Sequence, residues 1–541
     1  MNGALSGFGG SLRLALRRDR ARLPLWALGV AAFTAYCSQA LRLAVPKESD
    51  LAAMASLMSG PAGVVLVGPG YGFEQPSHAA VFAGGYGLYV ALLAACMSIL
   101  LVLRHTRAEE ESERLELLRA LPLARSTPQA VALLLLLITN VTVALLSWAI
   151  LVTTFDPWSS LLFACGVAMV GFVFGTAALV TAQLSAHGRT AGGGAFLALG
   201  AAFAVRGVGD VLGFAHQTAE AKGSWLSWFS PLAWAQQTRV FVADRWWPLA
   251  LGLVTAAILV AVASALQSRR DLGAGIIPPR ESRASAGALL AGPFGLALRV
   301  QRGSVIGWVV AALLTGVSFG ALAKEVGDSL GKANDPLIVA ALGGDPSRLV
   351  DGYLAVCLLF GVVLAGCFVI LSVQRLAADE ASGRAEAVLA LPLGRVRWGL
   401  STLVVALGGG ALILVTTGAA TGAATAVAVN DASQTLRLTL AGFAYVPAVA
   451  VVAGIAFLGY ALRPGLVGVS WAVLGYGLFA SMLGGMLKLP DAAQWFSVFH
   501  HAGQPPFIEP NAGSLVGLSA VAIALISLGC LQLRRRDLRA G

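Results

Sequence analysis

Residues 129–152 read QAVALLLLLITNVTVALLSWAILV, a run of 24 residues without a charged side chain. A helix of about 20 apolar residues crosses the hydrocarbon core of a bilayer. The whole chain has this character, because 57% of its 541 residues are hydrophobic and only 12% are charged, against about 25% charged in an average soluble domain. A membrane β-barrel would instead show alternating segments of about 10 residues. The sequence therefore predicts an all-α polytopic membrane protein.

Twelve apolar spans can be drawn along the chain. They cover residues 23–41, 79–103, 129–152, 159–182, 193–213 and 248–267 in the first half, and 304–322, 351–373, 399–429, 438–461, 465–487 and 514–533 in the second. If the spans alternate in direction, most of the 37 Lys and Arg residues fall on one side, and positive residues mark the cytoplasmic side. We therefore expect a multi-pass protein of the bacterial cytoplasmic (inner) membrane with both termini in the cytoplasm. The net charge of +10 then follows membrane sidedness and does not indicate nucleic-acid binding.

The two halves of the chain share short motifs. Each half closes with Arg-Arg-Asp-Leu-x-Ala-Gly, at residues 269–275 and 535–541. Six spans in each half give both halves the same orientation, as in parallel repeats. We predict a first six-span repeat over residues 1–272, a cytoplasmic linker over 273–293 and a second six-span repeat over 294–541.

A charged segment is also duplicated. Residues 101–125 read LVLRHTRAEEESERLELLRALPLAR, and residues 371–395 read LSVQRLAADEASGRAEAVLALPLGR. At an offset of 270 they share an acidic pair, a serine, an arginine, a glutamate, the run Ala-Leu-Pro-Leu and a final arginine. Charged and apolar positions separate at helical spacing, which predicts a short amphipathic helix after the second span of each half.

The sequence of the two charged segments also predicts ion pairs within each amphipathic helix and the residue near which each helix ends. An acid four residues before a base on a helix predicts ion pairs between Glu110 and Arg114 and between Glu380 and Arg384. Proline restricts the residue before it, so each helix is expected to end near residues 122 and 392.

Two interpretations of these helices remain open. Charge runs commonly keep a loop solvated, and shared ancestry alone could preserve the matches between the halves. A docking site for a soluble partner explains why the same residue types recur at the same spacing, and we favour it. The candidate docking residues are Glu109, Glu110, Glu113, Arg114, Glu116, Asp379, Glu380, Arg384 and Glu386.

The pattern acidic-Glu-x-Ser-x-Arg-x-Glu followed by Ala-Leu-Pro-Leu-x-Arg resembles the cytoplasmic motif after the second span of ABC-2 type transporter permeases. Gly383 keeps a glycine common in that motif, whereas Glu113 replaces it in the first half. The fused two-repeat form resembles bacterial exporters of polyketide antibiotics. The resemblance implies that the two acidic helices couple to an ABC ATPase subunit, in two copies.

ATP and Mg²⁺ are then expected on that partner. The chain has no G-x-x-x-x-G-K-[ST] motif for cradling phosphates, so we expect the permease to bind no cofactor and to contribute no catalytic residue. The function implied is export of hydrophobic or amphiphilic compounds such as antibiotics or drugs. The alternatives are a secondary transporter of the major facilitator type and a non-transporting membrane scaffold. The facilitator alternative would need coupled acids within its spans, where Asp210 is almost the only candidate.

Two further sets of polar residues are candidates for a functional site. Arg206 and Asp210 lie four residues apart near the outer end of the fifth span. Intramembrane charges are often functional, so this pair is a candidate for the substrate pathway, although a purely structural pair is the alternative. His500 and His501 lack a third ligand nearby, and no metal site is predicted.

Overall fold

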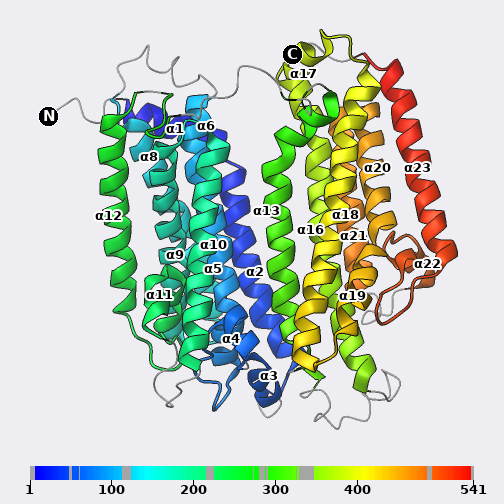
Figure 1. Cartoon of the computed structure of the whole chain (residues 1–541). Coiled ribbons are helices and arrows are strands. Elements are labelled where there is room, and N and C mark those ends of the chain that lie inside the picture. The colour runs from blue at the N-terminus through cyan, green and yellow to red at the C-terminus, as the bar shows by residue number, and fades with distance from the viewer. Residues whose placement is uncertain are drawn as a thin grey trace. The chain divides into compact units, whose positions relative to one another are not determined.

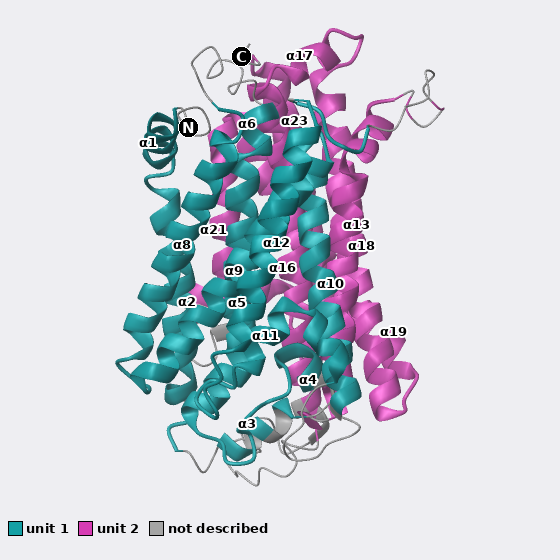
Figure 2. Ribbon diagram, turned by 90° about the vertical axis from the view of Figure 1, so that its left-hand side faces the viewer, with its two compact units in different colours: residues 1–282 teal, residues 283–541 magenta. Residues whose placement is uncertain are grey.

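The computed structural model describes residues 7–47, 51–59, 61–111, 124–214, 224–271, 273–278, 287, 290, 292–324, 326–327, 346–483 and 490–537. These residues form helices and connecting turns (Figure 1). Contacts between Cα atoms divide the chain into two compact units, residues 1–282 and 283–541 (Figure 2).

Among its described residues, unit 1 has six long helices and several short ones. The long helices are α2 (Arg22–Ala44), α5 (His78–His105), α8 (Thr127–Leu151), α9 (Pro157–Leu184), α10 (Gly188–Phe214) and α12 (Pro248–Arg269). The short ones are α1 (Phe8–Arg18), α3 (Leu51–Met58), α4 (Pro61–Val67), α6 (Arg107–Glu111), the 3-10 helix η2 (Trp225–Phe229) and α11 (Pro231–Gln237).

Unit 2 follows a related order of elements. Its longer helices are α13 (Pro293–Ala321), α16 (Pro346–Ala381), α18 (Arg395–Val429), α19 (Ser433–Phe443), α20 (Val446–Leu462), α21 (Val469–Leu483) and α23 (Ala512–Arg535). Its short elements are α17 (Arg384–Leu389), η4 (Pro464–Gly468), α22 (Asp491–Trp495) and η5 (His500–Ala502).

The prediction of an all-α polytopic membrane protein is confirmed. Among the described residues, 11 helical segments are long and apolar enough to cross a membrane. Each of the twelve predicted spans coincides with a helix, with α19 and α20 together forming one span and η4 and α21 another. The predicted span that is not among the 11 is α2, which is 23 residues long but less apolar. At about 1.5 Å per residue α2 still has the length to cross the bilayer.

Local residues decide where several helices begin and end. At the start of α9 the Asp156 carboxylate accepts hydrogen bonds from the backbone nitrogens of Trp158 and Ser159, at 3.0 and 2.9 Å, and Pro157 occupies the first turn. Between α16 and α17, Gly383 has a φ of 72°. Glycine adopts this left-handed conformation without strain, so it lets the chain turn from one helix into the next.

Each unit has well-buried helices at its centre. In unit 1, 72% of the most apolar window of α9 is buried, against 17% for α12. In unit 2 the α16 and α19–α20 spans are each 67% buried, whereas α23 is 17% buried. Figure 1 shows α12 and α23 at the margins of their units. The rest of its unit therefore covers little of the last span, α12 or α23.

Small residues bring α13 and α18 close together in unit 2. A methyl group at Gly320 would overlap the carbonyl oxygen of Thr421, and one at Gly316 would lie 2.7 Å from the carbonyl oxygen of Thr417. Close approach of backbones through small residues is a common way for membrane helices to associate. Glycine is thus required where α13 crosses α18.

Candidate functional site

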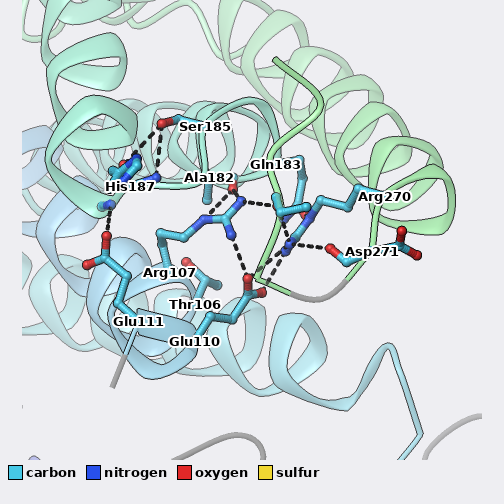
Figure 3. A network of polar contacts seen from close by, with 12 residues as sticks. Thr106, Arg107, Glu110, Glu111, Ala182, Gln183, Ser185, His187, Arg270 and Asp271 are labelled. Atoms are coloured by element: carbon cyan, nitrogen blue, oxygen red, sulfur yellow. Dashed lines mark hydrogen bonds and ion pairs between the residues drawn. The ribbon is translucent and has the colours of Figure 1, made fainter. Parts of the chain in front are cut away.

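The second acid of the first charged segment, Glu110 on α6, lies between two arginines (Figure 3). Its Oε2 atom is 2.7 Å from Nη1 of Arg107 and 2.9 Å from Nη1 of Arg270, and its Oε1 atom is 2.6 Å from Nη2 of Arg270. Arg107 is buried, and Arg270 has an exposed side-chain fraction of 5%. Glu110 is therefore the shared anionic partner of two guanidinium groups that are removed from water.

The same two arginines also bind the end of α9. Nη2 and Nε of Arg107 donate to the carbonyl oxygen of Ala182, at 2.6 and 3.0 Å. Nε of Arg270 donates to Oε1 of Gln183 at 2.6 Å. Since Arg270 directly follows α12, this network joins the segment after α5 to the ends of α9 and α12. We call Glu110, Arg270 and Gln183 the unit 1 clasp.

Unit 2 contains a corresponding arrangement. Glu380, near the end of α16, forms an ion pair with Arg536, the residue after α23. The hydroxyl of Tyr460, near the end of α20, donates to Oε2 of Glu380 at 2.9 Å. Arg536 returns a hydrogen bond from Nη1 to the carbonyl oxygen of Tyr460 at 2.6 Å, and its guanidinium lies 5.1 Å from the centre of that ring. We call Glu380, Arg536 and Tyr460 the unit 2 clasp.

The clasps are built from residues that the two halves share. Arg270 and Arg536 are the second arginines of the duplicated Arg-Arg-Asp motifs. The arginines that close the charged segments reinforce both sites, because Arg125 donates to the carbonyl oxygen of Arg270 and Arg395 donates to that of Arg536, the latter at 2.7 Å. Three of the repeated identities therefore have an intramolecular role.

One predicted ion pair is wrong. Arg384 pairs with Asp379, with Nε 3.0 Å from Oδ1, and Glu380 pairs with Arg536 instead of Arg384. Gly383 interrupts the helix between Glu380 and Arg384, so the spacing of a continuous helix does not apply. Arg114, the predicted partner of Glu110, lies outside the described residues, as do Glu113 and Glu116.

The remaining predicted docking residues differ in exposure. Asp379, Arg384 and Glu386 lie on the surface of unit 2. Glu109 forms an ion pair with Arg18, at the end of α1. Glu110 and Glu380 have exposed side-chain fractions of 10% and 5%. The charged segments thus combine buried acids with exposed ones.

Asp19, which sequence reasoning missed, ties the connection between α1 and α2 to the end of α5. Oδ1 of Asp19 lies 2.8 Å from Nη2 of Arg104, and Oδ2 lies 2.7 Å from Nε2 of His105. Burial by itself raises the pKa of Asp19, but the hydrogen bonds and positive charges of Arg104 and His105 outweigh it and hold this pKa below its ordinary 3.8. No repeat or motif in the sequence marked this residue.

The sequence did carry a signal for two other missed residues. Arg270 and Arg536 stand in a motif repeated at the end of each half. The Arg-Arg-Asp motif indicates the repeat. An arginine that recurs beside a span in both halves is also a candidate partner for an acid that recurs in both halves. Arg107 and Tyr460 have no such signal, because the corresponding positions in the other half carry different residue types.

The pair of Arg206 and Asp210 is buried in α10. Nη1 of Arg206 lies 3.2 Å from Oδ2 of Asp210, and Arg206 also donates to the carbonyl oxygen of Val65 at the end of α4. Oδ1 of Asp210 accepts a hydrogen bond from Oγ of Ser227 in η2 at 2.6 Å. The pair connects α10, α4 and η2, which supports the structural alternative.

A hollow of about 450 Å³ lies at the junction of α1, α2 and α8. Its walls are mainly apolar, with Leu23, Leu28 and Leu146 among them, and Asp19 and Arg20 also line it. Pockets that hold drug-sized ligands are typically about 300–1,000 Å³ and mostly apolar. The size and character of the hollow suit part of an amphiphilic molecule.

The chain resembles a known transporter along nearly its whole length. The family described as multidrug efflux system permease Rv1217c, C-terminal domain, matches residues 290–534. The chain is 36% identical to the multidrug efflux system permease protein Rv1217c of Mycobacterium tuberculosis, over 99% of this chain and 96% of the relative. This chain therefore belongs to the Rv1217c family of multidrug efflux system permeases.

Proposed function

We propose that this permease is the membrane-spanning subunit of an ATP-driven exporter of the ABC-2 type, powered by a separate ATPase chain. The name of the relative, a permease of an efflux system, supports a subunit that works with others. The observation that carries the proposal is the duplicated acidic segment, anchored to its unit by a buried ion pair in each half. A protein partner that binds an anchored segment can displace the segment together with the unit to which it is anchored.

The docking surface of unit 2 consists of Asp379, Arg384 and Glu386. Ala385 on α17 is buried, whereas Glu386 beside it is exposed, so α17 has one face on the unit and one face free for a partner. The ATPase would present basic groups to the acids. In this proposal Glu110 and Glu380 support the docking segments from within.

The energy for export would come from nucleotide binding on the partner. ATP binding shifts the permease between conformations only if the ATPase contacts one conformation more strongly than the other. The cargo would be hydrophobic or amphiphilic, in keeping with the apolar hollow at α1, α2 and α8. Hydrolysis and the ATP and Mg²⁺ sites would belong entirely to the ATPase chain, of which we propose two copies.

The proposed location is the bacterial cytoplasmic membrane, with both termini in the cytoplasm. Arg13, Arg17 and Arg20 flank the start of α2, and Arg534 and Arg535 end α23. Positive residues beside spans remain on the cytoplasmic side. This orientation places both charged segments where a cytoplasmic ATPase can reach them.

Co-purification tests the proposal. The tagged permease is isolated from its native host in mild detergent, and its partners are identified by mass spectrometry. We expect an ATPase subunit, and we expect Asp379→Arg combined with Glu386→Arg to release it. Glu509→Arg is the matched control, because Glu509 is an exposed acid that precedes α23, whereas the docking surface lies near the other end of unit 2.

Two results would contradict the proposal. A permease that exports a dye such as ethidium in vesicles with a proton gradient alone, and without an ATPase, would be a secondary transporter. A permease whose acidic segments react with a membrane-impermeant label from outside intact cells would have the opposite orientation.

A further inference from the structure

The two clasps connect three cytoplasmic helix ends within each unit. In unit 1 they are the ends of α5, α9 and α12, and in unit 2 the ends of α16, α20 and α23. These are the second, fourth and sixth predicted spans of each half. The same three-way connection is therefore present in both units.

The clasp residues resist separation because they are buried. Arg270 and Glu110 have exposed side-chain fractions of 5% and 10%, and Arg536 and Glu380 have 11% and 5%. Parting such a pair leaves a charge that neither water nor a counter-ion compensates. The segments that carry the pair consequently move together unless the pair breaks.

The last spans depend on this connection more than the central helices do. Most of the surface of α12 and α23 within their units is not covered by protein. Each packs mainly on the fourth span of its unit, α12 on α9 and α23 on α20. At the cytoplasmic end, Arg270 and Arg536 add bonds to both the charged segment and the fourth span.

We propose that the clasps are the links through which a displacement of the charged segments reaches the fourth and sixth spans. Glu110 and Glu380 act as positioning residues, and Arg270 and Arg536 receive the displacement. The inference rests on the proposed function for the source of the displacement, an ATPase bound to the segments. The inference specifies which helices move with each charged segment: α9 and α12 in unit 1, and α20 and α23 in unit 2.

Hydrogen–deuterium exchange of the purified complex tests the link in unit 2. Exchange is compared between the nucleotide-free complex and the complex trapped with ADP and vanadate. In the wild type we expect nucleotide-dependent changes both in residues 381–389 and at the end of α23, residues 530–537. In Glu380→Gln we expect the change in the segment to remain and the change at the end of α23 to be lost.

Transport and hydrolysis provide the functional readout. For Glu380→Gln in vesicles we expect ATP hydrolysis within about twofold of the wild type, while ethidium transported per ATP falls at least fivefold. The exchanged pair Glu380→Arg with Arg536→Glu should restore part of this ratio, because the ion pair is present again with opposite polarity. Glu509→Gln is the control for neutralising an acid outside the clasp.

The outcomes separate the two proposals. Absence of an ATPase from the wild-type preparation would refute the proposed function. An ATPase that binds normally, with Glu380→Gln leaving the nucleotide-dependent exchange at α23 intact, would overturn the link alone. Parallel losses of hydrolysis and transport, with no recovery in the exchanged pair, would also overturn it and would leave the clasp a purely structural contact.

Discussion

Replacing Glu110 with glutamine tests the unit 1 clasp most directly. The carboxylate accepts three charge-assisted hydrogen bonds, one from Arg107 and two from Arg270. Glutamine keeps one acceptor oxygen and loses the negative charge, so both guanidinium groups lose their anionic partner. Since hydrogen bonds to charged groups contribute about 1.5–3 kcal/mol each, losing two of them gives roughly 3–6 kcal/mol.

The known cost of breaking a buried ion pair gives a loss of stability of similar size. Breaking a buried ion pair by removing one partner costs about 3–5 kcal/mol, and both arginines here are largely removed from water. We therefore expect Glu110→Gln to lower the free energy of unfolding by about 3–5 kcal/mol. The additional change Arg270→Met should recover part of the loss, because it removes one of the two buried charges.

The assay is thermal unfolding in detergent, followed by tryptophan fluorescence, for the wild type, the two single variants and the double variant. The double-mutant cycle isolates the coupling between Glu110 and Arg270, which we expect to be about 0.5–3 kcal/mol for residues in direct contact. Glu509→Gln serves as the exposed control. The reasoning is refuted if Glu110→Gln lowers the melting temperature no more than this control, or if the single effects simply add.

The remaining predictions concern packing, pH and the α10 pair. Gly320→Ala should destabilise unit 2 by about 1–3 kcal/mol, because its methyl group meets the α18 backbone; Gly307→Ala on the same helix, with open space around it, should have no such cost in a melting experiment. The folded-state pKa of Asp19 lies below its ordinary 3.8, so its contribution to stability is complete above about pH 5 and is lost as pH falls below 3.8 through the folded-state value. Melting temperatures of wild type and Asp19→Asn should therefore differ at pH 7 and converge on acidification, and a constant difference would contradict this. Asp210→Asn should lower the melting temperature while dye export per folded molecule stays within about twofold; loss of export without loss of stability would instead place Asp210 in the substrate pathway.

Much of the fold could be predicted from the sequence. The apolar runs located the helices because a helix in a bilayer satisfies its backbone hydrogen bonds within the same segment. The apolarity of a segment is therefore enough to locate a membrane-spanning helix. It was least decisive for α2, where polar residues such as Gln39 and Ser38 lower the hydropathy of a helix that still has the length to span.

The candidate site was predicted only in part. The sequence identified Glu380 as a special residue through its repeat, but it assigned the wrong partner. Helical spacing suggested Arg384, whereas Glu380 binds Arg536, which lies 156 positions further along the chain. The glycine at 383 breaks the helix, and burial of the carboxylate then favours a cation that is buried with it.

The sequence alone thus determined the fold class, the apolar spans, the duplicated acidic segments and the repeated Arg-Arg-Asp motifs. Only the tertiary structure decided that these acids and arginines meet, and that Gln183 and Tyr460 complete their sites. The physical reason is that apolarity acts over consecutive residues in one helix. The partner of a buried charge is instead chosen by which distant helix ends packing brings within hydrogen-bond distance.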